Sequence, residues 1–116
     1  MFVHTLQAPG VRGCDICRPV LTVPSDGGPI HREVDYYAIA HMSKFVKTGA
    51  TYIESNGDYD NWNDLTTAAF INEDGTTVVV VHNPHIENSA SFAVNIDGNY
   101  YQYNDLPPQS SVSLIK

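Results

Sequence analysis

Two kinds of hydrophobic pattern occur in the chain, and the one typical of β-strands dominates its second half. Residues Leu65–Asn83 contain a turn signal, Asn72–Gly75, between the apolar segment Ala68–Ile71 and six consecutive β-branched residues, Thr76–Val81. Such side chains favour strands. A segment that is apolar at every position is typical of a strand buried on both faces. The stretch therefore predicts a β-hairpin with Val78–Val81 as a central strand.

Four more segments have the length and composition of short strands. They are Thr51–Glu54, Ser91–Ile96, Asn99–Tyr103 and Ser111–Ile115. Asp97 and Gly98 stand between the second and third of these, and this dipeptide is typical of the tightest hairpin turns. About six short strands with turns between them predict an antiparallel β-sandwich over residues 49–116.

The first part of the chain has one segment with a helical period, His31–Lys47. Its apolar side chains recur every three or four residues and would form one stripe. Acidic residues in the first turn and lysines in the last match the helix dipole, and Gly49 stands where a left-handed C-terminal cap would be. We expect residues 1–48 to form an irregular N-terminal segment followed by this helix, so the whole chain is mainly β.

Charge and length exclude several functions. The 116 residues suffice for one domain, and the net charge of −7 with scattered Lys and Arg argues against a nucleic-acid partner. No apolar stretch approaches the length of a membrane span, and residues 1–10 lack the features of a signal peptide.

Two motifs in order carry a resemblance to a known family. The stretches VDYYAIAHMSKFVKTGA and AAFINEDGTTVVVVHNP resemble the C-terminal part of glycoside hydrolase family 30, the glucosylceramidase-like enzymes. The resemblance implies the last helix of a (β/α)8 barrel followed by the C-terminal strands of a supporting β-sandwich. It also implies a catalytic barrel as partner, retaining hydrolysis of a β-linked sugar or glycolipid such as glucosylceramide, and a secreted or extracellular parent enzyme.

The catalytic chemistry of such an enzyme is not expected within this chain. Retaining glycosidases use two carboxylates, and in the family both come from barrel strands that would precede Met1. None of the 13 acidic residues here lies in an apolar segment that would raise its pKa. We therefore expect no catalytic residue, cofactor or metal site in these residues, and no glycosidase activity from the chain alone.

Cys14 and Cys17 form a single Cys-x-x-Cys pair. A structural zinc site needs four ligands, and a second pair is absent. A redox pair would open a helix, whereas Arg18-Pro19 leads into an extended stretch. We interpret the two cysteines as a local disulfide or as two unreactive thiols.

Aromatic residues suggest a second function of a different class. Tyr59 and Trp62 lie in a polar segment, where exposed rings could stack on pyranose faces, although packing in a core or an interface is the alternative. On that basis a stand-alone carbohydrate-binding β-sandwich is the alternative to a supporting domain. A structural module without a ligand is a third hypothesis.

Overall fold

The computed structural model describes residues 19–24, 26–54 and 65–116. The chain divides into two compact units, Met1–Met42 and Ser43–Lys116. Residues 43–48, which we expected to group with the N-terminal segment, belong to the second unit.

The first unit contains a short hairpin and most of the helix. Strand β1 (Leu21–Thr22) pairs antiparallel with β2 (His31–Arg32), and helix α1 spans Val34–Ser43. The Thr22 hydroxyl donates a hydrogen bond to Glu33 Oε1 at 2.7 Å. No residue of α1 is buried, so the apolar stripe predicted for the helix is largely exposed in this structure.

The helix is shorter than the predicted His31–Lys47, for a reason at each end. At its start, His31 and Arg32 pair with β1, and Glu33 N–H donates to the carbonyl of Val20. After its end, the side chain of Asn72 takes over backbone groups that a longer helix would need. Asn72 Nδ2 donates to the Phe45 carbonyl at 3.0 Å, and Asn72 Oδ1 accepts from Lys47 N–H at 2.9 Å. Periodicity alone could not show this competition.

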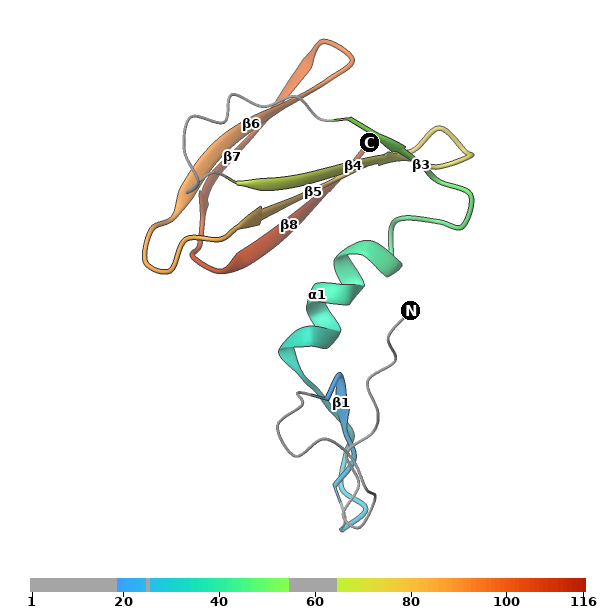
Figure 1. Ribbon diagram of the computed structural model, residues 1–116, viewed down its shortest axis with the longest axis vertical. Coiled ribbons are helices and arrows are strands. Elements are labelled where there is room, and N and C mark those ends of the chain that lie inside the picture. Colours follow the sequence, from blue (N-terminus) through green and yellow to red (C-terminus); the bar gives the residue numbers. More distant parts are fainter. Residues whose placement is uncertain (1–18, 25, 55–64) are drawn as a thin grey trace. The chain divides into compact units, whose positions relative to one another are not determined.

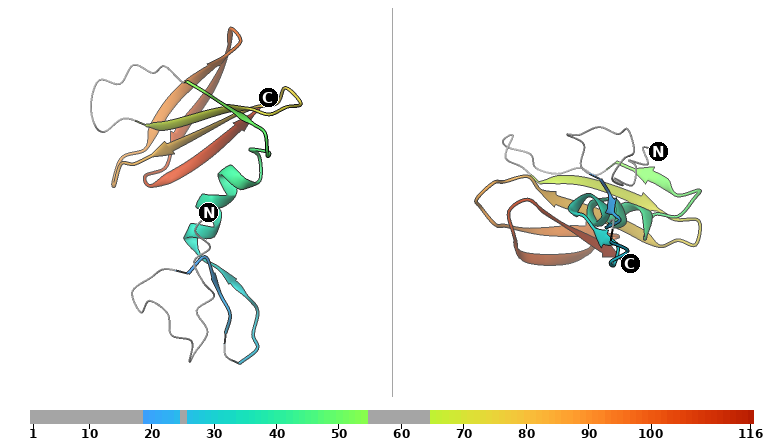
Figure 2. Two further views of the ribbon diagram at one scale, coloured as in Figure 1. Left: turned by 45° about the vertical axis from the view of Figure 1, so that its right-hand side comes forward. Right: turned by 90° about the horizontal axis from the view of Figure 1, so that it is seen from below.

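The second unit is a β-sandwich of two antiparallel layers (Figures 1 and 2). The strands of the larger layer, in spatial order, are β3 (Thr51–Ile53), β4 (Thr66–Ile71), β5 (Thr77–Asn83) and β8 (Ser110–Ile115). The smaller layer is the hairpin of β6 (Ala90–Ile96) and β7 (Asn99–Leu106). The predicted mainly β fold with six sandwich strands after one helix is confirmed.

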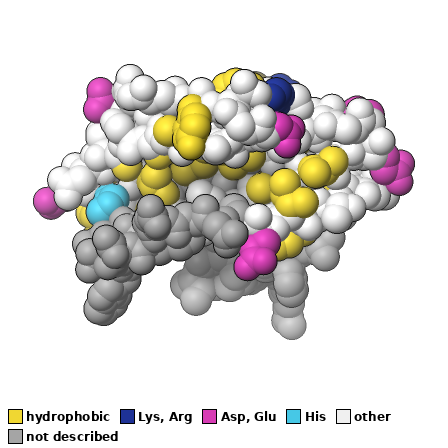
Figure 3. Space-filling view, turned by 90° about the horizontal axis from the view of Figure 1, so that it is seen from above, with side chains coloured by type: hydrophobic (Ala, Val, Ile, Leu, Met, Phe, Trp, Pro, Cys, Tyr) yellow, Lys and Arg dark blue, Asp and Glu magenta, His cyan; other side chains and the backbone are white. Residues whose placement is uncertain are grey.

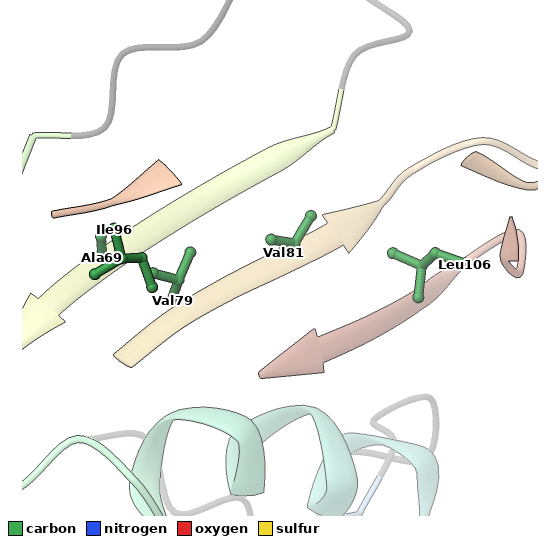
Figure 4. Close-up of a cluster of buried hydrophobic side chains, with 5 residues drawn as sticks. All are labelled: Ala69, Val79, Val81, Ile96 and Leu106. Atoms are coloured by element: carbon green, nitrogen blue, oxygen red, sulfur yellow. The ribbon is translucent and has the colours of Figure 1, made fainter. Parts of the chain in front are cut away.

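The hydrophobic core lies between these two layers (Figure 4). Ala69, Val79 and Val81 come from the four-stranded sheet, and Ile96 and Leu106 come from the β6–β7 hairpin. Half-buried side chains surround them, including Phe92 and Tyr103, which stack with their ring centroids 5.7 Å apart. Burial of these apolar groups is the main source of stability for the sandwich.

The prediction of a central strand at Val78–Val81 is confirmed with one correction. Strand β5 pairs with β4 on one side and β8 on the other. Val78, Val79 and Val81 are buried, whereas Val80 is only half-buried. Because alternate side chains point to opposite faces of a sheet, Val79 and Val81 enter the core and Val80 points to the other face.

One buried polar residue, Asn83, fastens the end of β5 to two neighbouring segments. Its Nδ2 donates to the carbonyl oxygens of Asn88, Leu106 and Pro107 at 2.9, 3.0 and 3.1 Å. Its Oδ1 accepts from His85 N–H at 3.0 Å. The side chain is fully buried and its polar atoms are satisfied, so Asn83 holds the β5–β6 connection and the end of β7 in one place.

The turns of both predicted hairpins form as expected. Asp97 and Gly98 have φ angles of 51° and 82°, the two positive values that define the type I′ turn and match the twist of the strands. In the β4–β5 turn, Gly75 N–H donates to the Asn72 carbonyl and Thr76 N–H donates to Asp74 Oδ1. Lys47 Nζ forms an ion pair with the Asp74 carboxylate.

The contacts in this turn allow a prediction about the titration of Asp74. The hydrogen bonds from Lys47 and Thr76 hold the pKa of Asp74 well below its ordinary value. Lys47→Met should raise that pKa toward the ordinary value but leave it still lowered, because the bonds from Thr76 remain. NMR titration of the Asp74 carboxyl carbon in both proteins would measure the change. An identical titration in the variant would contradict the ion pair.

The sign of the linked stability effect follows from this lowered pKa. The ionised carboxylate stabilises the fold above the unfolded-state pKa, and that contribution is lost as the pH falls through the folded-state pKa. Both side chains are about half exposed or more, so water screens the pair and the effect on unfolding should be small.

Candidate interaction surface

The face of the four-stranded sheet that points away from the core is apolar along one edge. The register aligns four hydrophobic residues side by side across the sheet, in the order Tyr52, Phe70, Val78 and Ile115. The next cross-strand row is Ala68, Val80 and Ser113, and the third is Thr66, His82 and Ser111. We call these three rows the outer face, which is graded from apolar to polar.

The apolar row is partly accessible to solvent. Tyr52 is 60% exposed and Ile115 is 48% exposed, while Phe70 is half-buried and meets Tyr52 edge to face with ring centroids 5.7 Å apart. Exposed side chains on the outward face of an antiparallel sheet are usually polar. Val78, in the middle of the row, has no exposed surface, so the accessible apolar area lies mainly at the two ends of the row. Exposed apolar side chains of this kind are typical of a surface that another structure covers.

The polar end of the outer face carries one histidine-serine pair. His82 Nδ1 lies 3.0 Å from Ser111 Oγ, and both residues are half-buried. The two residues are direct cross-strand partners, and polar pairs at such positions stabilise sheets. Cross-strand pairing therefore accounts for this contact without a catalytic role. His41, a second half-buried histidine, lies in α1.

The acidic residues that the structure describes do not assemble into a site. Each of them is exposed or half-buried, and among the described residues no three His, Cys, Asp or Glu side chains are grouped to hold a metal ion. Figure 3 shows one face of the molecule, where Asp and Glu side chains stand apart from one another and hydrophobic groups gather in a band across the middle. The described acidic residues therefore do not form the paired carboxylates that retaining glycosidases use.

The structure does not describe the site residues that were predicted from the sequence. Cys14, Cys17, Tyr59 and Trp62 all lie outside the described residues, so the disulfide and the sugar contact stay predictions. The outer face was not anticipated. Its signal is present in the sequence, because Phe70, Val78 and Val80 are apolar at the parity opposite to Ala69, Val79 and Val81. That pattern equally predicts a strand buried on both faces, which holds for Val78 but not for Phe70 and Val80.

The family comparison matches this fold. Residues 49–114 match the glycosyl hydrolase family 30 beta sandwich domain. The chain belongs to glycoside hydrolase family 30. It contains the β-sandwich domain of that family. The resemblance stated from the two sequence motifs is thereby confirmed.

Relatives in sequence come from fungi and a nematode. An endo-1,6-beta-D-glucanase of Neurospora crassa is 36% identical over 77 residues, which cover 64% of this chain and 16% of the relative. A putative glucosylceramidase 2 of Caenorhabditis elegans is 33% identical over 98 residues, covering 83% of this chain and 19% of the relative. This chain thus spans less than a fifth of either protein.

Solved structures give the same result. The endo-beta1,6-glucanase BT3312 superposes with a TM-score of 0.71 at 34% identity, covering 87% of this chain and 21% of that one. SrfJ from Salmonella typhimurium has a TM-score of 0.76 over 86% of this chain and 21% of its own, at 24% identity, which establishes likeness of fold. In the described residues of the present chain, no helix is long and apolar enough to span a bilayer.

Proposed function

We propose that this family 30 β-sandwich supports the catalytic barrel of a retaining β-glycosidase through its outer face. The observation that carries the proposal is the cross-strand row of Tyr52, Phe70, Val78 and Ile115, which is apolar on the side of the sheet opposite the core. Packing a barrel surface against this row would remove its exposed apolar area from water. We also propose that the first unit, Met1–Met42, with most of α1, belongs structurally to the barrel.

The proposed substrate is a β-linked glucoside, either a β-glucan or a glucolipid. Relatives bearing the names endo-1,6-beta-D-glucanase and putative glucosylceramidase support this class. Retaining hydrolysis requires two carboxyl groups about 5 Å apart at the scissile bond. The barrel would supply that pair, and the parent enzyme would be secreted or extracellular. The role of the present residues is to hold the barrel, not to contact the reacting atoms.

A chimera tests the supporting role. In it, this chain replaces the matching portion of the Neurospora crassa endo-1,6-beta-D-glucanase, and hydrolysis of an aryl β-glucoside and of β-1,6-glucan is measured. We expect the chimera to be active and the present chain alone to be inactive on both substrates. Tyr52→Asp should lower the activity of the chimera about tenfold or more, because a carboxylate in an apolar contact loses its hydration.

The matched control is Ile86→Asp, which introduces the same charge at a residue that is 78% exposed in the β5–β6 connection. This variant should keep the activity of the parent chimera, and both variants should unfold at nearly the parent temperature as isolated chains. Equal activity of Tyr52→Asp and Ile86→Asp would show that the outer face is not the barrel contact. Hydrolysis by the isolated chain would refute the supporting role altogether.

A further inference from the structure

The outward face of the β6–β7 hairpin has a composition unlike the outer face of the other layer. Its residues alternate with those that enter the core, and they are uncharged. Outward positions on the two strands are held by Ser91, Ala93, Asn95, Tyr100, Gln102 and Asn104, all exposed. The nearest acidic residues along the strands, Asp97 and Asp105, stand at the two ends of this strip. We call these six residues the amide strip.

One aromatic ring stands in the middle of the amides. Tyr100 is 75% exposed and is the direct cross-strand partner of Asn95, while Gln102 is the partner of Ala93. Single exposed aromatic residues are common on soluble proteins. What distinguishes Tyr100 is its neighbours, which are both amides. Asn95 lies across the hairpin from it, and Gln102 lies two residues further along β7.

Two hydrogen bonds hold the amides in place before any ligand arrives. Gln102 Nε2 donates to Asn104 Oδ1 at 2.9 Å, and Gly98 N–H donates to Asn95 Oδ1 at 2.9 Å. These bonds leave Gln102 Oε1 as an acceptor and the Nδ2 groups of Asn95 and Asn104 as donors. A side chain that is already ordered loses less entropy when it binds.

We propose that the amide strip binds an uncharged polysaccharide of pyranose units. Tyr100 would stack on the apolar face of one ring, and the amides of Asn95, Gln102 and Asn104 would exchange hydrogen bonds with hydroxyl groups of that ring and its neighbours. Alternate residues of a strand are roughly 6.7 Å apart, so Tyr100, Gln102 and Asn104 extend along two or three sugar units. An uncharged strip suits a neutral polymer and gives no ionic attraction for an anionic one.

The proposal goes beyond the supporting role and rests on the proposed function only for the choice of β-glucan as the probe. Its consequence is that the sandwich would hold a polymer on the layer opposite the barrel contact. Such a surface raises the local concentration of the polymer at the enzyme, as a second linked site does in general. Cleavage of a short aryl glucoside would not benefit from it.

The proposal is tested by measuring the binding of soluble β-1,6-glucan to the full chain with affinity electrophoresis and calorimetry. Tyr100→Ala should weaken binding about tenfold or more, the loss expected for one ring contact. Tyr100→Phe should bind like the parent because it keeps the ring. Gln102→Ala should weaken binding to a smaller extent. The control is Tyr37→Ala, which removes a tyrosine that is 56% exposed on α1 and should not alter binding.

Thermal unfolding of each variant verifies that the fold is intact, which we expect because Tyr100 and Gln102 are exposed. Absence of binding by the parent chain to β-1,6-glucan, β-1,3-glucan and β-1,4-glucan would overturn the proposal. Binding that survives Tyr100→Ala would overturn it as well, since the sugar would then lie elsewhere. A dimer that dissociates in Tyr100→Ala, without glucan binding, would assign the strip to self-association instead. In the chimera, Tyr100→Ala should still cleave the aryl glucoside, because that substrate does not need the amide strip. Loss of glucan binding with retained cleavage of the aryl glucoside therefore concerns the amide strip alone and leaves the proposed barrel contact intact.

Discussion

Replacing Val81 with aspartate should abolish the cooperative unfolding transition of the chain. Val81 has no exposed surface and packs between the two layers against Leu106 and its neighbours. A carboxylate there would lose its hydration with no partner for its charge, at a cost of several kcal/mol. Small domains are stable by only about 5–15 kcal/mol in total. Circular dichroism during heating and urea titration would show a gradual change in place of a sigmoidal one.

Val80→Asp is the matched control, because it introduces the same charge one residue earlier in the same strand. Val80 is half-buried and points to the outer face, so its carboxylate can keep part of its hydration. We expect this variant to unfold cooperatively at a lower temperature. If Val80→Asp abolished the transition and Val81→Asp preserved it, the assignment of the two faces of β5 would be reversed.

Asn83→Ala should lower the free energy of unfolding by about 1–3 kcal/mol, because it leaves the buried Leu106 carbonyl and two partly buried carbonyl groups without this donor. The parent side chain donates to three carbonyl oxygens and accepts from His85 N–H. Chemical denaturation monitored by fluorescence would measure the loss. Asn99→Ala is the control, since Asn99 is exposed and its side chain makes one long hydrogen bond of 3.4 Å to the Asp97 carbonyl. It should change stability by less than about 0.5 kcal/mol.

Asn83→Asp should make the stability of the fold depend on pH. The new carboxylate would face three carbonyl oxygens without water, so the folded state would favour its protonated form and raise its pKa above the unfolded value of about 4. A raised folded-state pKa means that stability is greatest below the unfolded pKa and falls as the pH rises through the folded pKa. The variant should therefore be less stable at pH 7 than at pH 4, relative to the parent. A constant difference between the two proteins would contradict the burial of this group.

The sandwich could be predicted because its signals are local. The β-branched residues Thr76–Val81, the turn at Asn72–Gly75 and the dipeptide Asp97-Gly98 each specify backbone conformation within a few residues. The ends of α1 could not be predicted in this way. They depend on pairing with β1, on a hydrogen bond to Val20 and on hydrogen bonds to Asn72, all of which are distant in sequence.

The outer face and the amide strip could not be predicted from local sequence signals either. The apolar row on the outer face exists because Tyr52, Phe70, Val78 and Ile115 share one register across four strands, and strand order cannot be obtained from periodicity. The amide strip similarly depends on which side of the β6–β7 hairpin faces the core. The role of Asn83 was missed because an asparagine at the end of a strand is more often a turn residue.

The pairing of β8 with β5 has a consequence for how the protein is made. The larger sheet is completed by residues 110–115, and Lys116 exchanges two backbone hydrogen bonds with Thr77. While the ribosome is still adding these residues, β5 has one open edge and the core lacks Val112 and Leu114. Strands with an open edge readily pair with other chains. The nascent polypeptide is therefore prone to aggregation until β8 has paired, and a chaperone that shields the open edge of β5 would protect it during that interval.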